Sequence, residues 1–257
     1  MRPDADVHEV FRLASLGLSK AEVARRTGVS RAQLRSWLAA GLAATLASPM
    51  RAGSTQHVGD VCERRAQLDE AAYAYLLGQY LGDGCLSLGP RGVWRLRISA
   101  CDAYPGIKEE IASAVGAVLP GRHVGYIGRQ GCTELYSNSK HWICLFPQHG
   151  PGRKHERTIT LEPWQEAIAV NRHPDRLVRG LVHSDGCRVI NRVRGANGVS
   201  YAYLRYFLTN ESADILQIFE SACDRLEVEH RRNNRNSVSV ARRASVAKLD
   251  VIVGPKY

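Results

Sequence analysis

Two stretches of the chain, 102 residues apart, place an aspartate in the same surroundings. Residues 76–85 read LLGQYLGDGC and residues 178–187 read VRGLVHSDGC. Asp83 therefore matches Asp185, and each is followed by a Gly-Cys pair. An Asp-Gly pair that occurs once is typical of a turn, but its repetition with the same flanks favours a shared chemical role. Carboxylate oxygens are ligands that Mg²⁺ prefers, so the repeat predicts a site for Mg²⁺ or Mn²⁺.

The residues before each aspartate predict how the two acids are positioned. Small residues stand four apart in both copies, at Gly78 and Gly82 and again at Gly180 and Ser184, so each pair lies on one helix face. Glycine inside a helix costs about 1 kcal/mol relative to alanine, and close packing of two helices explains its presence. That packing would bring both aspartates together at helix C-termini, where carboxylates are disfavoured and repel each other. Divalent cations would relieve both penalties.

Each copy shows one order of elements: helix, two strands, helix, two strands, helix. Apolar periodicity and β-branched runs between Gly, Asn or Pro predict these elements. In copy one they cover 69–82, 85–88, 93–101, 105–118, 123–128, 132–137 and 140–146, and in copy two 175–184, 187–192, 201–209, 213–226, 229–232, 237–241 and 245–252. Pairing Leu96-Arg97 with Leu204-Arg205 requires a six-residue insertion around Arg192–Val199 in the second copy.

The N-terminal residues predict two helices joined by a short turn. Ser19 with Glu22 forms a capping-box pattern, Gly28 is typical of a helix end, and Ser30 caps the next helix. The stretch resembles the helix-turn-helix of resolvases and small repressors, whose second helix lies in the major groove. The exposed side chains at the start of that helix would be Arg31, Gln33 and Arg35. The alternative is a helical hairpin that contacts no DNA.

These features divide the chain into five parts. They are a helix-turn-helix domain at 1–41, a linker at 42–68, a first repeat at 69–150, a basic connector at 151–173 and a second repeat at 174–257.

The composition favours a polyanionic partner. The chain has 257 residues, 44% of them hydrophobic, and 35 Lys+Arg against 25 Asp+Glu for a formal charge of +10. It shows no apolar run long enough to cross a bilayer and no N-terminal signal core. We therefore expect a cytoplasmic, nucleoid-associated protein with reduced cysteines. The chain has no C-x-x-C pair, so the sequence does not predict a zinc site, and His57 and Cys62 are interpreted as loop residues.

The paired motifs inside matching repeats resemble the LAGLIDADG homing endonuclease family over residues 69–257. The chain departs from the family pattern at Gln79, Leu81, Arg179 and His183 but keeps both metal-binding acids. The resemblance implies an α+β fold with saddle-shaped antiparallel sheets that lie in the major groove of double-stranded DNA. It implies a monomer that acts as a pseudo-dimer and binds DNA through Arg91, Arg95, Arg192, Arg194, Tyr203, Arg231, Arg232, Asn234, Arg235, Arg242 and Arg243.

The resemblance also implies metal-dependent hydrolysis of phosphodiester bonds, in which Asp83 and Asp185 each serve one strand of a double-strand break. Gly82 and Ser184 would be metal ligands beside the aspartates. A basic residue would stand near the metals, and repeat symmetry offers Arg97 and Arg205, with Lys140 and Lys248 as other options.

Two further functions remain open. A transcriptional regulator could use the LAGLIDADG fold with a helix-turn-helix and bind DNA without cutting it, although such a protein would have no need for both carboxylates. An inactive remnant of an intein or mobile element is the other possibility, although the splicing residues are missing at VIVGPKY. A metabolic enzyme is disfavoured because the chain has no Walker loop, G-x-G-x-x-G or G-x-S-x-G motif.

Overall fold

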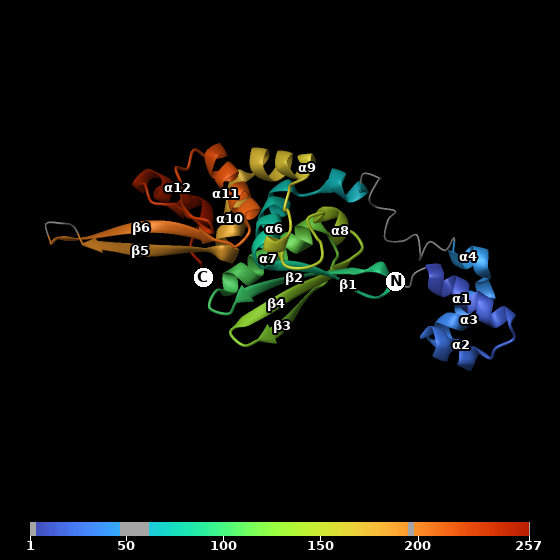
Figure 1. Cartoon of the computed structure of the whole chain (residues 1–257). Helices are drawn as coiled ribbons and strands as arrows, with labels where there is room; N and C mark the ends of the chain where they lie inside the picture. The colour runs from blue at the N-terminus through green and yellow to red at the C-terminus, as the bar shows by residue number, and fades with distance from the viewer. Residues whose placement is uncertain (1–3, 47–61, 195–197, 257) are drawn as a thin grey trace. The chain divides into compact units, whose positions relative to one another are not determined.

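The computed structural model describes residues 4–46, 62–194 and 198–256. The chain divides into two compact units, Met1–Val61 and Cys62–Tyr257, which we call the head and the body (Figure 1). Residues 47–61 of the expected linker, including His57, and residues 195–197 of the expected insertion lie outside the described residues.

The head is a small helical unit. Its helices are α1 (Asp4–Ser15), α2 (Lys20–Thr27), α3 (Arg31–Ala40) and α4 (Leu42–Leu46). The buried side chains of its core come from α1, α2, the turn and α3, and they are Val10, Leu13, Val23, Val29 and Leu34. The helix α4 is a difference from the prediction, which placed a linker from residue 42.

The two predicted caps of the head are formed. The Ser19 hydroxyl accepts a hydrogen bond from the Glu22 amide at 3.3 Å, and Ser30 accepts one from the Gln33 amide at 3.2 Å. Gly28 ends α2 with φ 64°, the left-handed conformation that glycine adopts without strain. The capping box is only half formed, because the Glu22 carboxylate binds Arg25 and Arg26. The two helices predicted on either side of Gly28 are therefore present.

The body contains the two predicted repeats. The first comprises α6 (Glu70–Asp83), β1 (Gly84–Leu88), β2 (Trp94–Cys101), α7 (Pro105–Val118), β3 (Val124–Arg129), β4 (Cys132–Ser139) and α8 (Trp142–Leu145). The second comprises α10 (Pro174–Asp185), β5 (Gly186–Arg194), β6 (Ser200–Thr209), α11 (Ala213–Arg225), β7 (Arg231–Asn234), β8 (Ser237–Val240) and α12 (Arg243–Val253). Both have the predicted order of helices and strands.

Each repeat builds one antiparallel four-stranded sheet. The strand orders are β1-β2-β4-β3 and β5-β6-β8-β7, so the two sheets have the same topology. Alternate residues of β2, namely Leu96, Ile98 and Ala100, are buried against the helices, while the residues between them face away. One hydrophobic core runs through both repeats, with α6 and α10 at its centre (Figure 1).

The connecting segments contain more helix than predicted. The 3₁₀-helices η1 (Glu63–Gln67) and η3 (Lys154–Glu156), the helix α9 (Pro163–Glu166) and the π-helical turn η4 (Ala167–Arg172) lie between the predicted elements. None of the described helices has the length and apolar character needed to span a bilayer.

The strand register corrects the predicted alignment of the copies. Gly84 pairs with Ile98, and the matching Gly186 pairs with Leu208, so the second copy is eight residues longer here rather than six. Arg97 stands opposite Cys85, whereas Arg205 stands opposite Val189. The two arginines therefore do not occupy equivalent positions, because the extra residues lengthen β5 and β6 by regular pairing.

Candidate metal centre at the paired helix ends

The two motif helices α6 and α10 pack backbone to backbone. A Cβ atom on Gly180 would lie 2.2 Å from the Tyr75 carbonyl oxygen, and one on Gly78 would lie 2.6 Å from the Leu177 carbonyl oxygen. Real Cβ atoms do not approach backbone that closely, so only glycine fits at these positions. The predicted packing of the motif helices through Gly78 and Gly180 agrees with this geometry.

This packing brings the C-terminal ends of both helices together. A Cβ atom on Gly82 would lie 3.0 Å from Asp185 Oδ2 and 2.2 Å from the Ser184 hydroxyl oxygen. Asp83 is the next residue of the chain and its side chain is open to solvent, while Asp185 is half-buried. The charge of Asp185 acts on Asp83, so the two carboxylates are close enough to interact at the ends of their helices.

The electrostatic environment of the pair disfavours two negative charges. The pKa of Asp83 is raised to about 6, first by loss of hydration and then by the charge of Asp185. Loss of hydration also raises the pKa of Asp185, although a hydrogen bond from Asn210 opposes that shift. Such a pair is stabilised by added positive charge.

Two lysines that the sequence analysis did not single out supply positive charge. Lys154 Nζ donates hydrogen bonds to the carbonyl oxygens of Leu81 and Gly82, at 2.9 and 2.8 Å, and to that of Tyr80. Burial lowers the pKa of Lys154 to about 8, against the opposing pull of the two aspartates. Lys154 thus binds the last carbonyls of α6, where the helix dipole is negative.

Lys256 makes the corresponding hydrogen bonds at the end of α10. Its Nζ donates to the Gly186 carbonyl oxygen at 2.5 Å and to that of His183 at 3.3 Å. Burial lowers its pKa too, and Asp83 and Asp185 oppose this. The lysines are 102 residues apart, the same offset as the aspartates, and each follows a glycine by two residues in GRK and GPK. Extending the self-comparison past the last helices would have found them.

The two halves of the centre differ at one side chain. Asn210 Nδ2 donates to Asp185 Oδ2 at 2.6 Å, and the Asn210 Oδ1 accepts from the Ser212 amide at 2.8 Å. The strand register places Ala100 at the equivalent position of the first repeat, and alanine has no such donor. Asp185 is therefore held in place, while Asp83 lacks this support.

The other predicted metal ligands are occupied by protein contacts. The Gly82 carbonyl oxygen accepts from Lys154, as described above. The Ser184 hydroxyl donates to the Gly180 and Leu181 carbonyls at 3.1 and 3.0 Å within its own helix. The carboxylates of Asp83 and Asp185 remain the donors best suited to a hard divalent cation. The residues present therefore fit a Mg²⁺ or Mn²⁺ site.

The four residues that repeat symmetry offered as the basic catalytic residue lie in environments that do not include the two aspartates. Arg97 Nη1 lies 3.8 Å from Glu134 Oε2, and Arg205 lies with its guanidinium 5.6 Å from the centre of the Phe207 ring. Lys248 donates to the Leu226 carbonyl at 3.2 Å, near the end of α11, and Lys140 is an exposed residue after β4. Lys154 and Lys256 fit the predicted role better, because they alone among these residues interact electrostatically with both aspartates in the part of the chain that the structure describes.

The predicted DNA-contacting residues separate onto two sides of the sheets. On the face turned away from the helices lie Arg95, Arg97, Tyr203, Arg205 and Arg231. Arg91 is exposed in the β1–β2 turn with φ 59°. The Nε atoms of Arg97 and Arg205 have no hydrogen-bond partner among the described residues.

Other candidates lie on the helix-covered side. Strand alternation places Arg192 and Arg194 on the same face of β5 as Arg188, which binds Asp250 of α12. Arg232 pairs with Glu220 of α11, and Arg242 pairs with Glu229 at 2.7 Å at the start of α12. Arg243 begins α12, and Arg235 lies in the exposed β7–β8 turn. Asn234 is the exposed last residue of β7 and pairs with Ser237, so it lies on the face turned away from the helices. The sequence could not separate these faces, because it does not show the strand register.

Two of the residues at which the chain departs from the family pattern, Leu81 and His183, belong to the core. Leu81 is buried, and His183 is buried between Tyr75 and the end of α12. The Tyr75 hydroxyl lies 3.1 Å from His183 Nδ1, and His183 Nε2 lies 3.1 Å from the Val253 carbonyl oxygen. The carbonyl can only accept, so Nε2 carries the proton and Nδ1 accepts from tyrosine. Burial lowers the pKa of His183 to about 4, so it is neutral at pH 7.

No protein-family model and no curated sequence matches the chain. Several solved structures are similar to it. The homing endonuclease I-DmoI in complex with DNA and Ca covers 72% of this chain and 91% of its own, with 16% identity and a TM-score of 0.47. I-DmoI in complex with DNA and Mn covers 73% and 99%, with 18% identity and a TM-score of 0.46. The LAGLIDADG meganuclease I-AabMI bound to uncleaved DNA covers 70% and 82%, with 13% identity and a TM-score of 0.44. The body has the predicted α+β architecture of two antiparallel four-stranded sheets, and it is similar to these LAGLIDADG endonucleases.

Proposed function

We propose that this chain is a LAGLIDADG-type endonuclease that hydrolyses both strands of a specific double-stranded DNA site with divalent metal ions. The observation that carries the proposal is the meeting of Asp83 and Asp185 at the ends of two helices that only glycine allows to pack so closely. Two carboxylates placed there do not serve the stability of the fold, because loss of hydration disfavours both charges and the charge of Asp185 also disfavours that of Asp83.

The proposed mechanism assigns a task to each charged group. A bound Mg²⁺ or Mn²⁺ ion would supply an activated water and stabilise the leaving oxygen. Asp83 and Asp185 would hold the metal ions, each on the side of one DNA strand. Lys154 and Lys256 stand beside the aspartates and would stabilise the negative charge that develops on the phosphate. Their hydrogen bonds to helix-end carbonyls orient both ammonium groups toward the centre.

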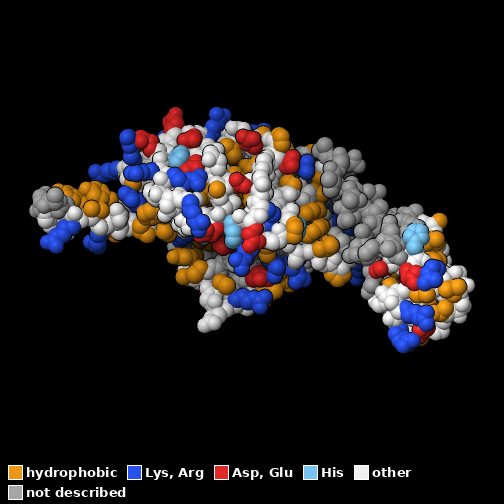
Figure 2. Space-filling view, viewed as in Figure 1, with side chains coloured by type: hydrophobic (Ala, Val, Ile, Leu, Met, Phe, Trp, Pro, Cys, Tyr) orange, Lys and Arg blue, Asp and Glu red, His pale blue; other side chains and the backbone are white. Residues whose placement is uncertain are grey.

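The proposed DNA surface is the face of both sheets turned away from the helices. Its arginines, Arg95, Arg97, Arg205 and Arg231, can bind phosphates or guanine through their guanidinium groups. The β5–β6 hairpin extends the surface with the stacked rings of Tyr201 and Tyr203, whose centres are 6.1 Å apart. Figure 2 shows basic and apolar side chains gathered along this hairpin. Such a strand pair fits the major groove.

The head is proposed as a second DNA-binding element. Its helix α3 is capped at Ser30, and the side chains of Arg31, Gln33 and Arg35 are exposed at its first turns. This is the part of a helix-turn-helix that contacts base edges.

The test begins with selection of bound DNA from a random pool by the full chain. The selected DNA is then incubated with Mg²⁺ or Mn²⁺ and wild type, Asp83→Asn/Asp185→Asn, or the control Asp224→Asn, which changes an exposed acid on α11. We expect metal-dependent cleavage of both strands by wild type and the control. The double variant should bind the same DNA as well or better, because it lacks two charges that repel phosphate, and should not cut it.

Two outcomes would contradict the proposal. Tight binding without nicking by wild type in either metal would make the chain a non-cleaving DNA-binding regulator. Cleavage that persists in the double variant would show that the reaction takes place elsewhere in the protein.

A further inference from the structure

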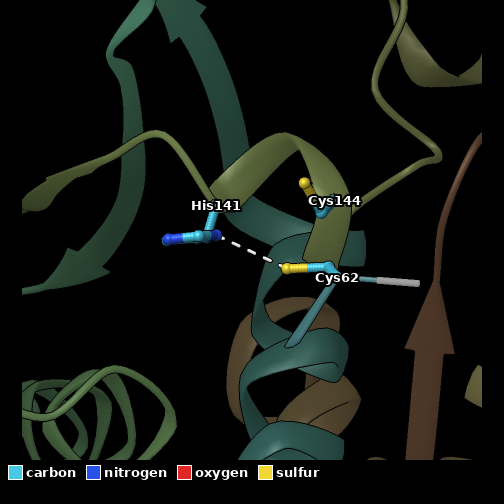
Figure 3. Close-up of side chains that lie close together, drawn as sticks. All are labelled: Cys62, His141 and Cys144. Atoms are coloured by element: carbon cyan, nitrogen blue, oxygen red, sulfur yellow. Dashed lines mark hydrogen bonds between the residues drawn. The ribbon is translucent and has the colours of Figure 1, made fainter. Parts of the chain in front are cut away.

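Three side chains with nitrogen or sulfur ligand atoms come together where the start of the body meets α8. Cys62, His141 and Cys144 each offer a ligand atom, and these atoms all lie within 4.8 Å of one another. Cys62 Sγ lies 3.4 Å from His141 Nδ1. Figure 3 shows the Cys62 sulfur and the imidazole nitrogen directed toward each other, with Cys144 beside them.

The spacing of these atoms suits a tetrahedral zinc ion. Zn–S bonds of about 2.3 Å and Zn–N bonds of about 2.1 Å place a sulfur and a nitrogen ligand roughly 3.6 Å apart, and two sulfur ligands roughly 3.8 Å apart. The observed sulfur–nitrogen distance is already close to this value. The remaining two distances are at most 4.8 Å, so binding of the ion would draw the Cys144 sulfur closer to the other two ligands.

The backbone around the cluster holds the ligands in place. His141 and Cys144 are three residues apart at the start of α8, so their side chains share one side of that helical turn. The Ser139 hydroxyl accepts from the His141 amide at 3.1 Å, and Arg65 donates to the Cys144 carbonyl at 3.2 Å. Cys62 directly precedes η1 at the beginning of the body.

The cysteines of the cluster differ from the other thiols near the sheets. Cys62 and Cys144 are 4% and 5% exposed, whereas Cys85, Cys101 and Cys187 are exposed. A metal ion would displace the protons of both thiols and bind them as thiolates.

We propose that Cys62, His141 and Cys144 bind one Zn²⁺ ion that ties the start of the body to α8. The site is separate from the aspartate centre in its ligands, and it does not depend on the chain being a nuclease. Its role is structural, because two of the three ligands are buried and the ion joins segments 79 residues apart in the chain. The sequence search for C-x-x-C missed it, because the ligands come as one distant cysteine and a His-x-x-Cys pair.

The experiment uses the full chain carrying Asp83→Asn/Asp185→Asn, so that metal at the aspartate centre does not contribute. After reduction and removal of metals, the protein is loaded with Zn²⁺ for elemental analysis or with Co²⁺ for absorption spectroscopy. We expect about one ion per chain, with a thiolate-to-cobalt charge-transfer band and the intense visible bands of tetrahedral cobalt. The variants Cys62→Ser and Cys144→Ser should lose the band, and the control Cys85→Ser should keep it.

A second measurement needs no cysteine variant, so its result does not depend on whether those variants fold. X-ray absorption of the zinc-loaded protein should show two sulfur scatterers at about 2.3 Å. A shell of oxygen and nitrogen alone would overturn the proposal. The same conclusion would follow if reduced protein took up no ion, or if Cys85→Ser lost the cobalt band while Cys62→Ser retained it.

Discussion

Asp83 and Asp185 occupy the end of a helix that is least favourable for an acid, since the last carbonyls already concentrate negative charge there. Lys154 and Lys256 donate hydrogen bonds to carbonyl oxygens at these helix ends. The lysines therefore serve two purposes in our proposal: they cap the helix ends and keep positive charge beside the acids. Their recurrence at the offset of the aspartates ties both purposes to the repeat.

Removing either lysine should slow cleavage more than it weakens binding. We expect Lys154→Met and Lys256→Met each to reduce the single-turnover cleavage rate about 100-fold, because a positioned charge near the transition state contributes roughly that much. The affinity for the selected DNA, measured in Ca²⁺, should change by much less. Lys248→Met removes an exposed lysine that binds the end of α11 and should leave the rate unchanged. An equal loss in all three variants would contradict the assignment.

His183 should make the body less stable in mild acid. Its pKa is about 4 when folded and about 6.5 when unfolded, so the unfolded chain binds more protons between these values. Stability is therefore present above pH 6.5 and lost as the pH falls toward 4, by about 3 kcal/mol for this buried group. Urea unfolding with EDTA at a series of pH values measures the loss, and His183→Gln should flatten it.

Asp83 should act in the opposite direction in the same experiment. Its pKa is raised when folded, so protonation of its carboxylate stabilises the body as the pH falls below about 6. Because its side chain is open to solvent, we expect only about 1 kcal/mol. Asp83→Asn should remove this contribution and steepen the acid loss. A pH profile unaffected by either variant would show that neither group titrates as described.

At the scale of elements, the contact between α6 and α10 decides where the acids lie. The helices approach so closely that a glycine of one lies against the backbone of the other, and each helix ends directly in a strand whose first residue is also glycine. Gly84 and Gly186 would each place a Cβ atom within 2.7 Å of the preceding turn of helix. The sharp passage from helix to strand thus fixes the direction of both carboxylates.

Gly180→Ala should destabilise the body by about 3 kcal/mol, because the new methyl group meets the Tyr75 carbonyl oxygen at 2.2 Å and the helices must separate. Gly116→Ala is a matched control within α7, where the added methyl group meets nothing within 4 Å. It should leave stability unchanged or raise it by about 0.5–1 kcal/mol through helix propensity. Chemical denaturation measures both, and similar losses in the two variants would refute close packing at Gly180.

At the scale of the whole molecule, two units with separate cores each present basic side chains to solvent. The head offers the exposed start of α3, and the body offers the outer faces of its two sheets. The formal charge of +10 is consistent with binding of a polyanion by both.

If the head binds DNA, its arginines should contribute to the salt dependence of binding by the full chain. We expect Arg31→Ala and Arg35→Ala each to lower the slope of log K against log salt concentration by about one. Arg12→Ala is the control, because this arginine of α1 already pairs with Glu9 at 2.6 Å. Fluorescence anisotropy over a range of salt concentrations measures the slopes. Identical slopes for all four proteins would make the head a helical hairpin without a role in DNA binding.

Much of this architecture follows from local patterns. The helix over Pro105–Val118 begins and ends at the predicted residues, and most strands differ from prediction by one or two residues. The short helices of the connector were less predictable. Helices of four to six residues contain too few turns for an apolar period to be seen, and their ends are decided by contacts with the core.

By itself the sequence determined the repeat, the order of elements and the two aspartates, because each can be recognised from residue types that recur at short or constant spacing. Only the tertiary structure decided the partners that reach these residues from distant segments. Lys154 and Lys256 act on helix ends more than 70 residues away in the chain, and Cys62 meets His141 across 79 residues. Strand register likewise decided which arginines face outward. Such contacts depend on how helices and strands from distant parts of the chain pack together, and local sequence patterns do not determine this packing.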